Sequence, residues 1–226
     1  AIALGWIKDS RAVDPLIQEL TNESCPLCIA SVSLAFINDT RAIAPMIESL
    51  GNSSCDEQIA GALAFMGEPA LYPLIDILSN TDEYPEKRAA ASALGSLGDS
   101  RAIDALVESL IDDDNYIRAK SAKALGDIGD SRANDALISA LSDEDEFVRF
   151  NAATALGMIG NSDAVDPLIE VLEDDYVEYV RASSAEALGR IGDPKAADAL
   201  IKSIKDDESE YVKSSAAEAL GKILKK

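Results

Sequence analysis

The chain has 226 residues, of which 47% are hydrophobic and only 5% aromatic, so its core must be built from Ala, Leu, Ile and Val. Its 41 acidic and 20 basic residues give a net charge of −21. This charge argues against nucleic acid and anionic membrane surfaces as partners, because binding to either depends on Lys and Arg. The absence of histidine removes the commonest general base and metal ligand, so we expect no catalytic site, cofactor or metal.

A recurring motif, Ala-Leu-Gly or a degenerate form of it, organises the whole chain. Its leucine falls at eight positions: Leu4, Leu34, Leu63, Leu94, Leu125, Leu156, Leu188 and Leu220. Successive leucines are 29 to 32 residues apart. Such a period predicts a repeat solenoid, in which each repeat buries its apolar face against its neighbours.

Taken in chain order, the elements repeat one pattern of two helices, which we call helix A and helix B. Residues 1–7 correspond to the last turns of a helix B, so the sequence begins inside a repeat. Four repeats carry a proline at one position early in helix A: Pro15, Pro45, Pro73 and Pro167. Proline is tolerated there because the N–H lacks a partner in the first turn, so helix A begins later than its Asp suggests or bends at this point. The last helix B covers about residues 209–224.

The repeat from Asp130 to Gly160 illustrates the pattern. Asp130 is placed to cap helix A through its carboxylate, and apolar residues at a spacing of three to four follow it: Ala133, Ala136, Leu137, Ala140 and Leu141. A polar turn covers residues 142–145, and helix B then has its own buried stripe: Val148, Ala152, Ala155, Leu156 and Ile159. Gly160 ends helix B, because glycine readily adopts the left-handed conformation that closes a helix.

These residues resemble the short HEAT-like repeat first associated with phycobilin lyases, and the resemblance covers essentially the whole chain. The shared pattern is a Gly-Asp turn, a Leu-rich helix A, an acidic turn, Val-Arg and then Ala-Leu-Gly. The resemblance implies an all-α fold, a right-handed α-α superhelix of about seven two-helix repeats. We expect one elongated domain over residues 1–226, because each repeat depends on its neighbours for stability.

The resemblance also implies a ladder in which an Asp of each turn and the Arg after the Val join successive repeats. Carried over residue by residue, the ladder comprises Asp112, Arg118, Asp143, Arg149, Asp174, Arg181, Asp206 and Lys213. Arg suits this structural role because its planar guanidinium can bridge two turns. In the first repeats Pro26-Leu27 and Cys55-Asp56 stand where Val-Arg is expected, so we expect the ladder to be absent there.

The three cysteines, Cys25, Cys28 and Cys55, make an odd count without a disulfide-scaffold pattern, so we expect a reducing, cytoplasmic location. Cys25 and Cys28 form a C-x-x-C motif that can act as a redox pair. The three thiolates together could also gather on a metal. A thioredoxin-like context and a fourth ligand are both missing, and Cys55 replaces a buried valine of the repeat. Packing is therefore the favoured role for Cys55.

The position two residues after each key leucine should be exposed on the concave face lined by B helices, where repeat proteins bind. In the first three repeats this position is aromatic: Trp6, Phe36 and Phe65. Together with Ile29 and Val32, these residues predict an apolar partner-binding patch at the N-terminal end of that face. Two alternatives stay open: the side chains are repacked into the core, or a segment preceding residue 1 covers them.

We therefore expect a non-catalytic scaffold, a monomer, whose protein partner is basic or offers an apolar anchor. Phe150, with Tyr116 and Asn151 in the middle repeats, is a second candidate contact region, with an ordinary half-buried aromatic as the favoured alternative. Two other functions remain open. One is an accessory factor or subunit of an enzyme, such as a phycobilin lyase-like protein, which the resemblance implies. The other is a structural or regulatory repeat segment of a larger chain.

Overall fold

The structure, a computed structural model, describes residues 9–20, 26–51 and 55–225. These ranges form fourteen α-helices and seven short 3-10 helices, and they contain no β-strand. Among the described residues no helix is both long and apolar enough to cross a membrane. The predicted all-α class is confirmed, and the helices follow one another as the repeat pattern requires.

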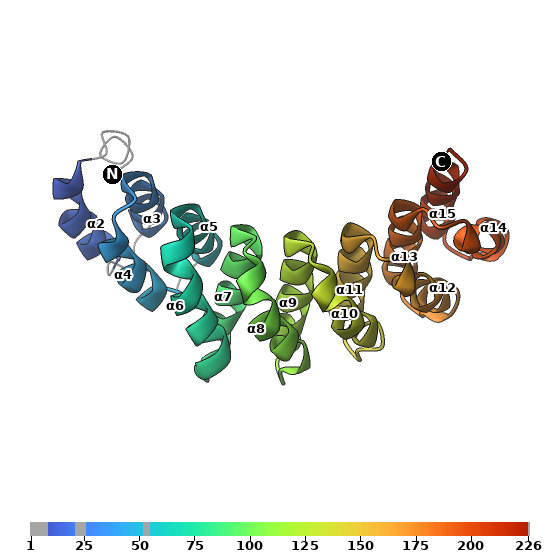
Figure 1. Cartoon of the computed structure of the whole chain (residues 1–226), viewed down its shortest axis with the longest axis horizontal. Coiled ribbons are helices and arrows are strands. Elements are labelled where there is room, and N and C mark those ends of the chain that lie inside the picture. The colour runs from blue at the N-terminus through green and yellow to red at the C-terminus, as the bar shows by residue number, and fades with distance from the viewer. Residues whose placement is uncertain (1–8, 21–25, 52–54, 226) are drawn as a thin grey trace. The chain divides into compact units, whose positions relative to one another are not determined.

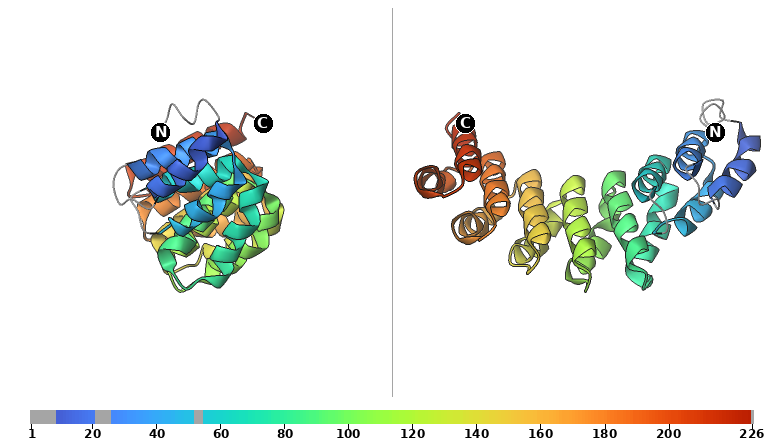
Figure 2. Two further views of the ribbon diagram at one scale, coloured as in Figure 1. Left: turned by 90° about the vertical axis from the view of Figure 1, so that its left-hand side faces the viewer. Right: turned by 180° about the vertical axis from the view of Figure 1, so that it is seen from behind.

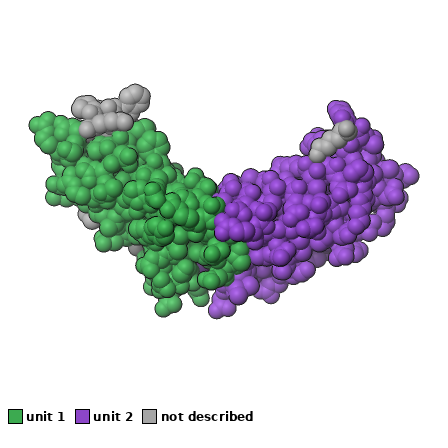
Figure 3. All heavy atoms as spheres, in the orientation of Figure 1, with its two compact units in different colours: residues 1–109 green, residues 110–226 purple. Residues whose placement is uncertain are grey.

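The chain divides into two compact units, residues 1–109 (unit 1) and residues 110–226 (unit 2), which Figure 3 colours separately. Unit 1 contains α2 (Val13–Leu20), α3 (Pro26–Ile37), α4 (Ile43–Glu48), α5 (Asp56–Met66), α6 (Glu68–Asn80), α7 (Tyr84–Leu97) and α8 (Ile103–Glu108). The B helices α3, α5 and α7 pack side by side in chain order, and the A helices α2, α4, α6 and α8 do the same. The helices α2, α4 and α6 also pack on α3, α5 and α7 in turn, which gives unit 1 two layers (Figure 1).

Unit 2 repeats this arrangement. It contains α9 (Asn115–Ile128), α10 (Asn134–Ala140), α11 (Glu146–Ile159), α12 (Val165–Asp174), α13 (Glu178–Ile191), α14 (Ala197–Asp206) and α15 (Glu210–Ile223). The B helices α9, α11, α13 and α15 form one row, and α10, α12 and α14 pack against α11, α13 and α15 in turn. Figure 2 shows the same helix pairs from two other directions.

Local caps explain where the helices begin and end. Asp130 accepts a hydrogen bond from the backbone N–H of Arg132 at 3.0 Å, as the predicted cap requires, but it opens a 3-10 turn rather than the α-helix itself. Such turns precede most A helices: η1 (Ser10–Ala12), η2 (Thr40–Ala42), η3 (Ser100–Ala102), η5 (Ser131–Ala133), η6 (Ser162–Ala164) and η7 (Pro194–Ala196). A further 3-10 helix, η4 (Ser109–Ile111), follows α8. The α-helical part of helix A therefore begins later than its Asp, which resolves one of the two expectations for the prolines. Pro73 differs, because it lies inside α6.

The key leucines lie in the hydrophobic core of both units. Six of them have no exposed surface: Leu34, Leu63, Leu94, Leu125, Leu156 and Leu188. Four of these leucines also accept a backbone hydrogen bond from the glycine that ends their helix. At Gly160, for example, φ is 76° and the N–H donates to the Leu156 carbonyl at 2.9 Å. Each of these four leucines thus contributes its side chain to the core and its carbonyl oxygen to the hydrogen bond that ends the helix.

Candidate partner-binding groove

Helix α3 carries an unusual exposed face. Its twelve residues include no charged side chain, and Ile29, Val32 and Phe36 are 38%, 38% and 37% exposed. Their spacing of three and four residues places them on one side of the helix. These three predicted patch residues are therefore surface residues, and the alternative that they are repacked into the core is excluded for them.

A groove runs between α3 and α5, which pack side by side. Its volume is about 270 Å³, and we call it the α3–α5 groove. The residues that line it are Val32, Ala35, Phe36, Gln58, Gly61, Ala62 and Phe65. Phe65 is 64% exposed, and its ring meets that of Phe36 edge to face, with the centroids 5.7 Å apart. The structure thus brings together three of the predicted residues. Ile29 lies one turn away on the same helix face, and Trp6 lies outside the described residues.

The residue composition of the groove differs from that of the B helices of unit 2. There, the residue after each key leucine is glycine, and a Cβ on Gly126 would lie 2.8 Å from both the Cα and the Cβ of Ala155 on the next B helix. Ordinary carbon contacts are about 3.5–4.0 Å, so only glycine permits this approach. Helix α3 has Ala35 at that position, and Ala35 and Ala62 both line the groove.

A disulfide bond ties the two walls of the groove together. Cys28 of α3 is bonded to Cys55, the N-cap residue of α5, and their Cα atoms are 5.2 Å apart. Cys28 lies one turn before Val32, so the bond lies towards the amino-terminal ends of α3 and α5. The packing role predicted for Cys55 is incomplete: the residue is buried, but as half of a cystine. Cys28 is therefore not paired within the C-x-x-C motif, and Cys25 lies outside the described residues.

This pairing bears on the expected location. The cytoplasmic expectation rests on cysteines without a disulfide pattern, whereas disulfides persist mainly in oxidising compartments. Sequence reasoning considered that the three cysteines could meet at a metal, but it did not pair Cys28 with Cys55, because the two cysteines belong to different repeats.

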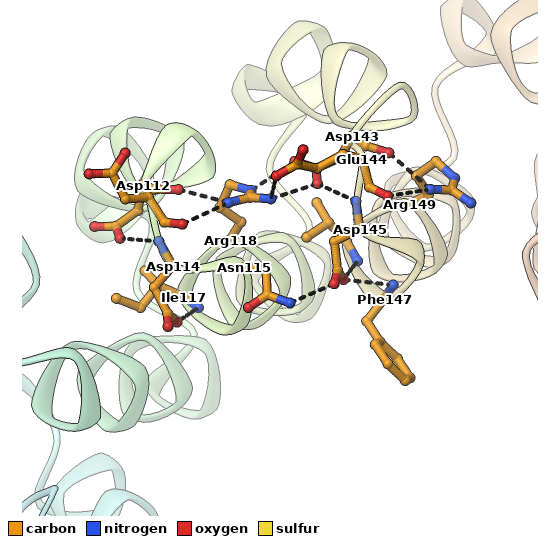
Figure 4. Close-up of polar contacts among 12 residues, drawn as sticks. Asp112, Asp114, Asn115, Ile117, Arg118, Asp143, Glu144, Asp145, Phe147 and Arg149 are labelled. Carbon is orange, nitrogen blue, oxygen red and sulfur yellow. Dashed lines mark hydrogen bonds and ion pairs between the residues drawn. The ribbon is translucent and has the colours of Figure 1, made fainter.

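A second arrangement joins the turns between helices A and B in unit 2. Arg118 donates from Nε and Nη2 to the two carboxylate oxygens of Asp143 in the next repeat, both at 2.8 Å. Its Nη1 donates to the backbone carbonyl of Asp112 in its own turn at 3.0 Å. Asp143 also accepts from the backbone N–H of Asp145 at 2.8 Å. Figure 4 shows Arg118 lying between the two turns, so that one guanidinium bridges consecutive repeats.

The bridge recurs in the next two repeats. Arg149 donates to the Asp175 carboxylate at 2.6 and 3.1 Å, and to the Asp143 carbonyl at 2.9 Å. Arg181 donates to the Asp207 carboxylate at 2.9 and 3.0 Å, and to the Asp175 carbonyl at 2.9 Å. These arginine side chains are almost completely buried, at 6% and 8% exposure.

Two of the predicted ladder residues are wrong by one position. Asp175 and Asp207, not Asp174 and Asp206, receive the arginines. The last two repeats are one residue longer, and the added residue lies before the turn: α12 and α14 each have ten residues and end at Asp174 and Asp206. A constant spacing of six residues between Asp and the following Arg or Lys would have identified the correct pair. The last ladder residue, Lys213, pairs with Glu210 at 2.8 Å.

With these features in place, the comparison with known families is direct. The family model for HEAT repeats matches residues 55–122, 110–189 and 178–221, which together cover most of the chain. The chain belongs to the HEAT repeat family. A comparison with curated proteins finds no significant match.

Solved structures share the HEAT repeat architecture at low sequence identity. A mutant of Kap121p has a TM-score of 0.76 and 16% identity over 94% of this chain and 29% of that chain. A designed armadillo repeat protein in complex with the peptide (KR)4 has a TM-score of 0.57 and 19% identity over 93% of this chain and 99% of that chain. The complex of CpcE and CpcF of phycocyanin lyase from Nostoc sp. PCC7120 has a TM-score of 0.50 and 20% identity over 93% and 94% of the two chains. These similarities show a common fold.

The electrostatics of the HEAT repeat ladder favour the charged forms of its members. The hydrogen bonds with Asp143 raise the pKa of Arg118 above its ordinary value. Burial acts to raise the pKa of Asp207, but hydrogen bonds from Arg181 and from the Ser209 backbone outweigh it, and the pKa of this carboxyl is lowered. The hydrogen bonds of the ladder thus stabilise the charged forms of Arg118 and Asp207.

The other predicted contact residue, Phe150, is half-buried in α11. Its ring packs edge to face on Tyr179 of α13, with centroids 5.8 Å apart. The more exposed ring nearby is Phe147, at 54%, which stacks on Tyr179 at 6.1 Å. Burial, together with the neighbouring Glu146, raises the pKa of Tyr179 to about 12, so its hydroxyl stays neutral at physiological pH. Phe147, Phe150 and Tyr179 therefore form an aromatic cluster in which Phe150 is half-buried and Phe147 is exposed to solvent.

Proposed function

We propose that this HEAT repeat protein is a non-catalytic scaffold that holds a segment of a partner protein in the α3–α5 groove. The observation that carries the proposal is the open apolar groove itself, flanked by the exposed rings of Phe36 and Phe65. Exposed apolar patches of this kind mark contact sites, and aromatic side chains dominate binding hot spots.

The size of the groove indicates the kind of occupant. Pockets for drug-sized ligands measure about 300–1,000 Å³, and the α3–α5 groove is at 270 Å³. An apolar side chain that anchors a protein segment fits this volume better than a free metabolite. The wall formed by α3 is uncharged, whereas the chain has a net charge of −21. We therefore expect the anchor to be apolar and the residues that flank it to be basic, because opposite charges speed and orient association.

Proteins of this fold support the proposal as a class. The designed armadillo protein is in complex with a peptide of Lys and Arg, and CpcE and CpcF are in complex with each other. The similarity to the CpcE–CpcF complex leaves a role as an enzyme accessory factor as the alternative function. The specific features of this chain, the groove and the absence of histidine, favour binding over catalysis.

The proposal is tested by selecting peptides from a displayed random library against the purified protein. We expect the selected peptides to share an apolar anchor next to Lys or Arg. Their affinity should fall about tenfold or more in a Phe36→Ala, Phe65→Ala variant, because hot-spot aromatics are worth about 2 kcal/mol or more. Met158→Ala is the matched control, since Met158 occupies the same repeat position in α11 and is 46% exposed.

Two results would contradict the proposal. The first is equal binding by wild type and the double variant. The second is a large loss of thermal stability in the double variant, because it would mean that the two rings serve the core. Unchanged binding by Met158→Ala would show that the effect belongs to unit 1.

A further inference from the structure

Four aromatic side chains form a row along unit 2. The second residue of every B helix in this unit is aromatic: Tyr116 in α9, Phe147 in α11, Tyr179 in α13 and Tyr211 in α15. The four helices pack side by side in this order, so the rings stand at the same end of neighbouring helices. We call this set the aromatic row.

The aromatic row is accessible. Tyr116, Phe147 and Tyr211 are 57%, 54% and 54% exposed, which is far more than the core-facing positions of the same helices. The half-buried Tyr179 ring stacks on Phe147 with the centroids 6.1 Å apart, so these two members of the row are in contact across α11 and α13. Figure 4 shows the Phe147 side chain directed away from the arginine ladder, so the ladder does not cover it.

Carboxylates flank the row. The first residue of three of these helices is acidic: Glu146, Glu178 and Glu210. The turns that precede α11 and α15 add Glu144 and Glu208, whose side chains are 91% and 90% exposed. The nearest ladder arginines lie 3.7 and 3.8 Å from these two carboxylates, and at such exposure these ion pairs are weak. The edge of unit 2 therefore combines exposed aromatic side chains with incompletely neutralised acids.

We propose that the aromatic row is a docking surface for an arginine-rich segment of a partner protein. A guanidinium stacks on an aromatic face through the cation–π interaction and at the same time pairs with a carboxylate. Unit 2 already contains this arrangement internally: the guanidinium of Arg149 lies 4.8 Å above the Tyr176 ring while it is forked to Asp175. The surface lies in a different unit from the α3–α5 groove and has different chemistry, so this inference does not depend on the proposed groove function.

Arginine fits the row better than lysine. The planar guanidinium stacks and is weakly hydrated, whereas the lysine ammonium is a strongly hydrated point charge. A surface that acted by charge alone would bind both equally. The comparison of arginine with lysine peptides therefore isolates the contribution of the rings.

The test is a fluorescence-anisotropy titration of the full chain with octa-arginine and with octa-lysine at about 150 mM salt. We expect octa-arginine to bind about tenfold or more tightly than octa-lysine, because each exposed ring adds a cation–π contribution. A Phe147→Leu, Tyr211→Leu variant keeps apolar bulk but removes two rings, and should weaken octa-arginine binding several-fold while leaving octa-lysine nearly unchanged. Tyr72→Leu, an exposed ring of α6, is the control and should change neither.

Equal affinity for the two peptides, or an unchanged octa-arginine affinity in the double variant, would overturn the inference. Thermal melting of each variant checks that the fold is retained, and a Tyr116→Leu, Tyr211→Leu variant gives the same comparison away from the Phe147–Tyr179 stack. The Phe36→Ala, Phe65→Ala variant should bind octa-arginine like wild type, which keeps a failure of the groove proposal distinct from a failure of this one.

Discussion

The same substitution, glycine to alanine, should have opposite effects in two B helices. At Gly189 a new Cβ would lie 2.6 Å from the Cα of Ala219 on the next B helix. At Gly61 it would meet nothing within 4 Å. Both positions are helical, so both substitutions gain about 1 kcal/mol of helix propensity.

The net effects follow from the contacts. At Gly189 the methyl group strikes backbone that cannot rotate away, so the cost should reach the upper end of the overpacking range, about 3 kcal/mol. Gly189→Ala should therefore lose about 2 kcal/mol of unfolding free energy, and Gly61→Ala should gain about 1 kcal/mol. The two variants should differ by about 3 kcal/mol.

Urea denaturation followed by circular dichroism measures this difference through the transition midpoints. Equal stabilisation by both variants would refute the reasoning. It would mean that α13 and α15 are not in backbone contact at Gly189.

Three further predictions concern the ladder and the disulfide. Arg149→Ala should destabilise the protein by about 3 kcal/mol, because it leaves a buried carboxylate unpaired, whereas Lys123→Ala, which breaks an exposed pair, should cost less than about 1 kcal/mol in the same urea titration. The folded pKa of Asp207 is lowered, so the stabilisation from its carboxylate is present above the unfolded pKa of about 4 and is lost as the pH falls through the lower, folded pKa. Asp207→Asn should therefore flatten the acid side of a stability–pH curve, and an unchanged curve would contradict the role of Asp207 in the ladder. The Cys28–Cys55 bond closes a loop over a sequence separation of 27, so reduction should cost up to about 3–4 kcal/mol; a thermal melt that dithiothreitol does not shift would show that the bond adds no stability.

Periodicity determined most of the fold in advance, because the core requirement repeats with every unit. The spacing of leucines such as Leu125 and Leu156 predicted the two-helix repeat. The glycine that follows α5, α7, α9, α11 and α13 predicted the end of each of these helices, since only glycine readily takes φ near 75°. Both features can be recognised in the sequence without knowing which repeats contact each other, so they could be predicted.

The features that sequence reasoning missed are relations between repeats. The α3–α5 groove is lined by residues of two helices from different repeats, such as Ala35 and Ala62. The ladder carboxylate is Asp175 rather than Asp174 because α12 contains the additional residue of a longer repeat. Tyr116 was predicted as a contact residue together with Phe150, but the row it forms with the second residues of the other B helices becomes clear only when these helices are aligned.

The measurement that tests the groove most directly is a titration of a selected peptide against a Gly61→Leu variant. Gly61 lines the α3–α5 groove and has open space around the position of its Cβ, so a leucine there should fill the groove. The same change should raise the melting temperature by about 2–4 °C, because leucine is the better helix former. We predict that the variant is more stable than wild type yet binds the peptide at least about tenfold more weakly. Wild-type affinity in a protein with a filled groove would contradict the account.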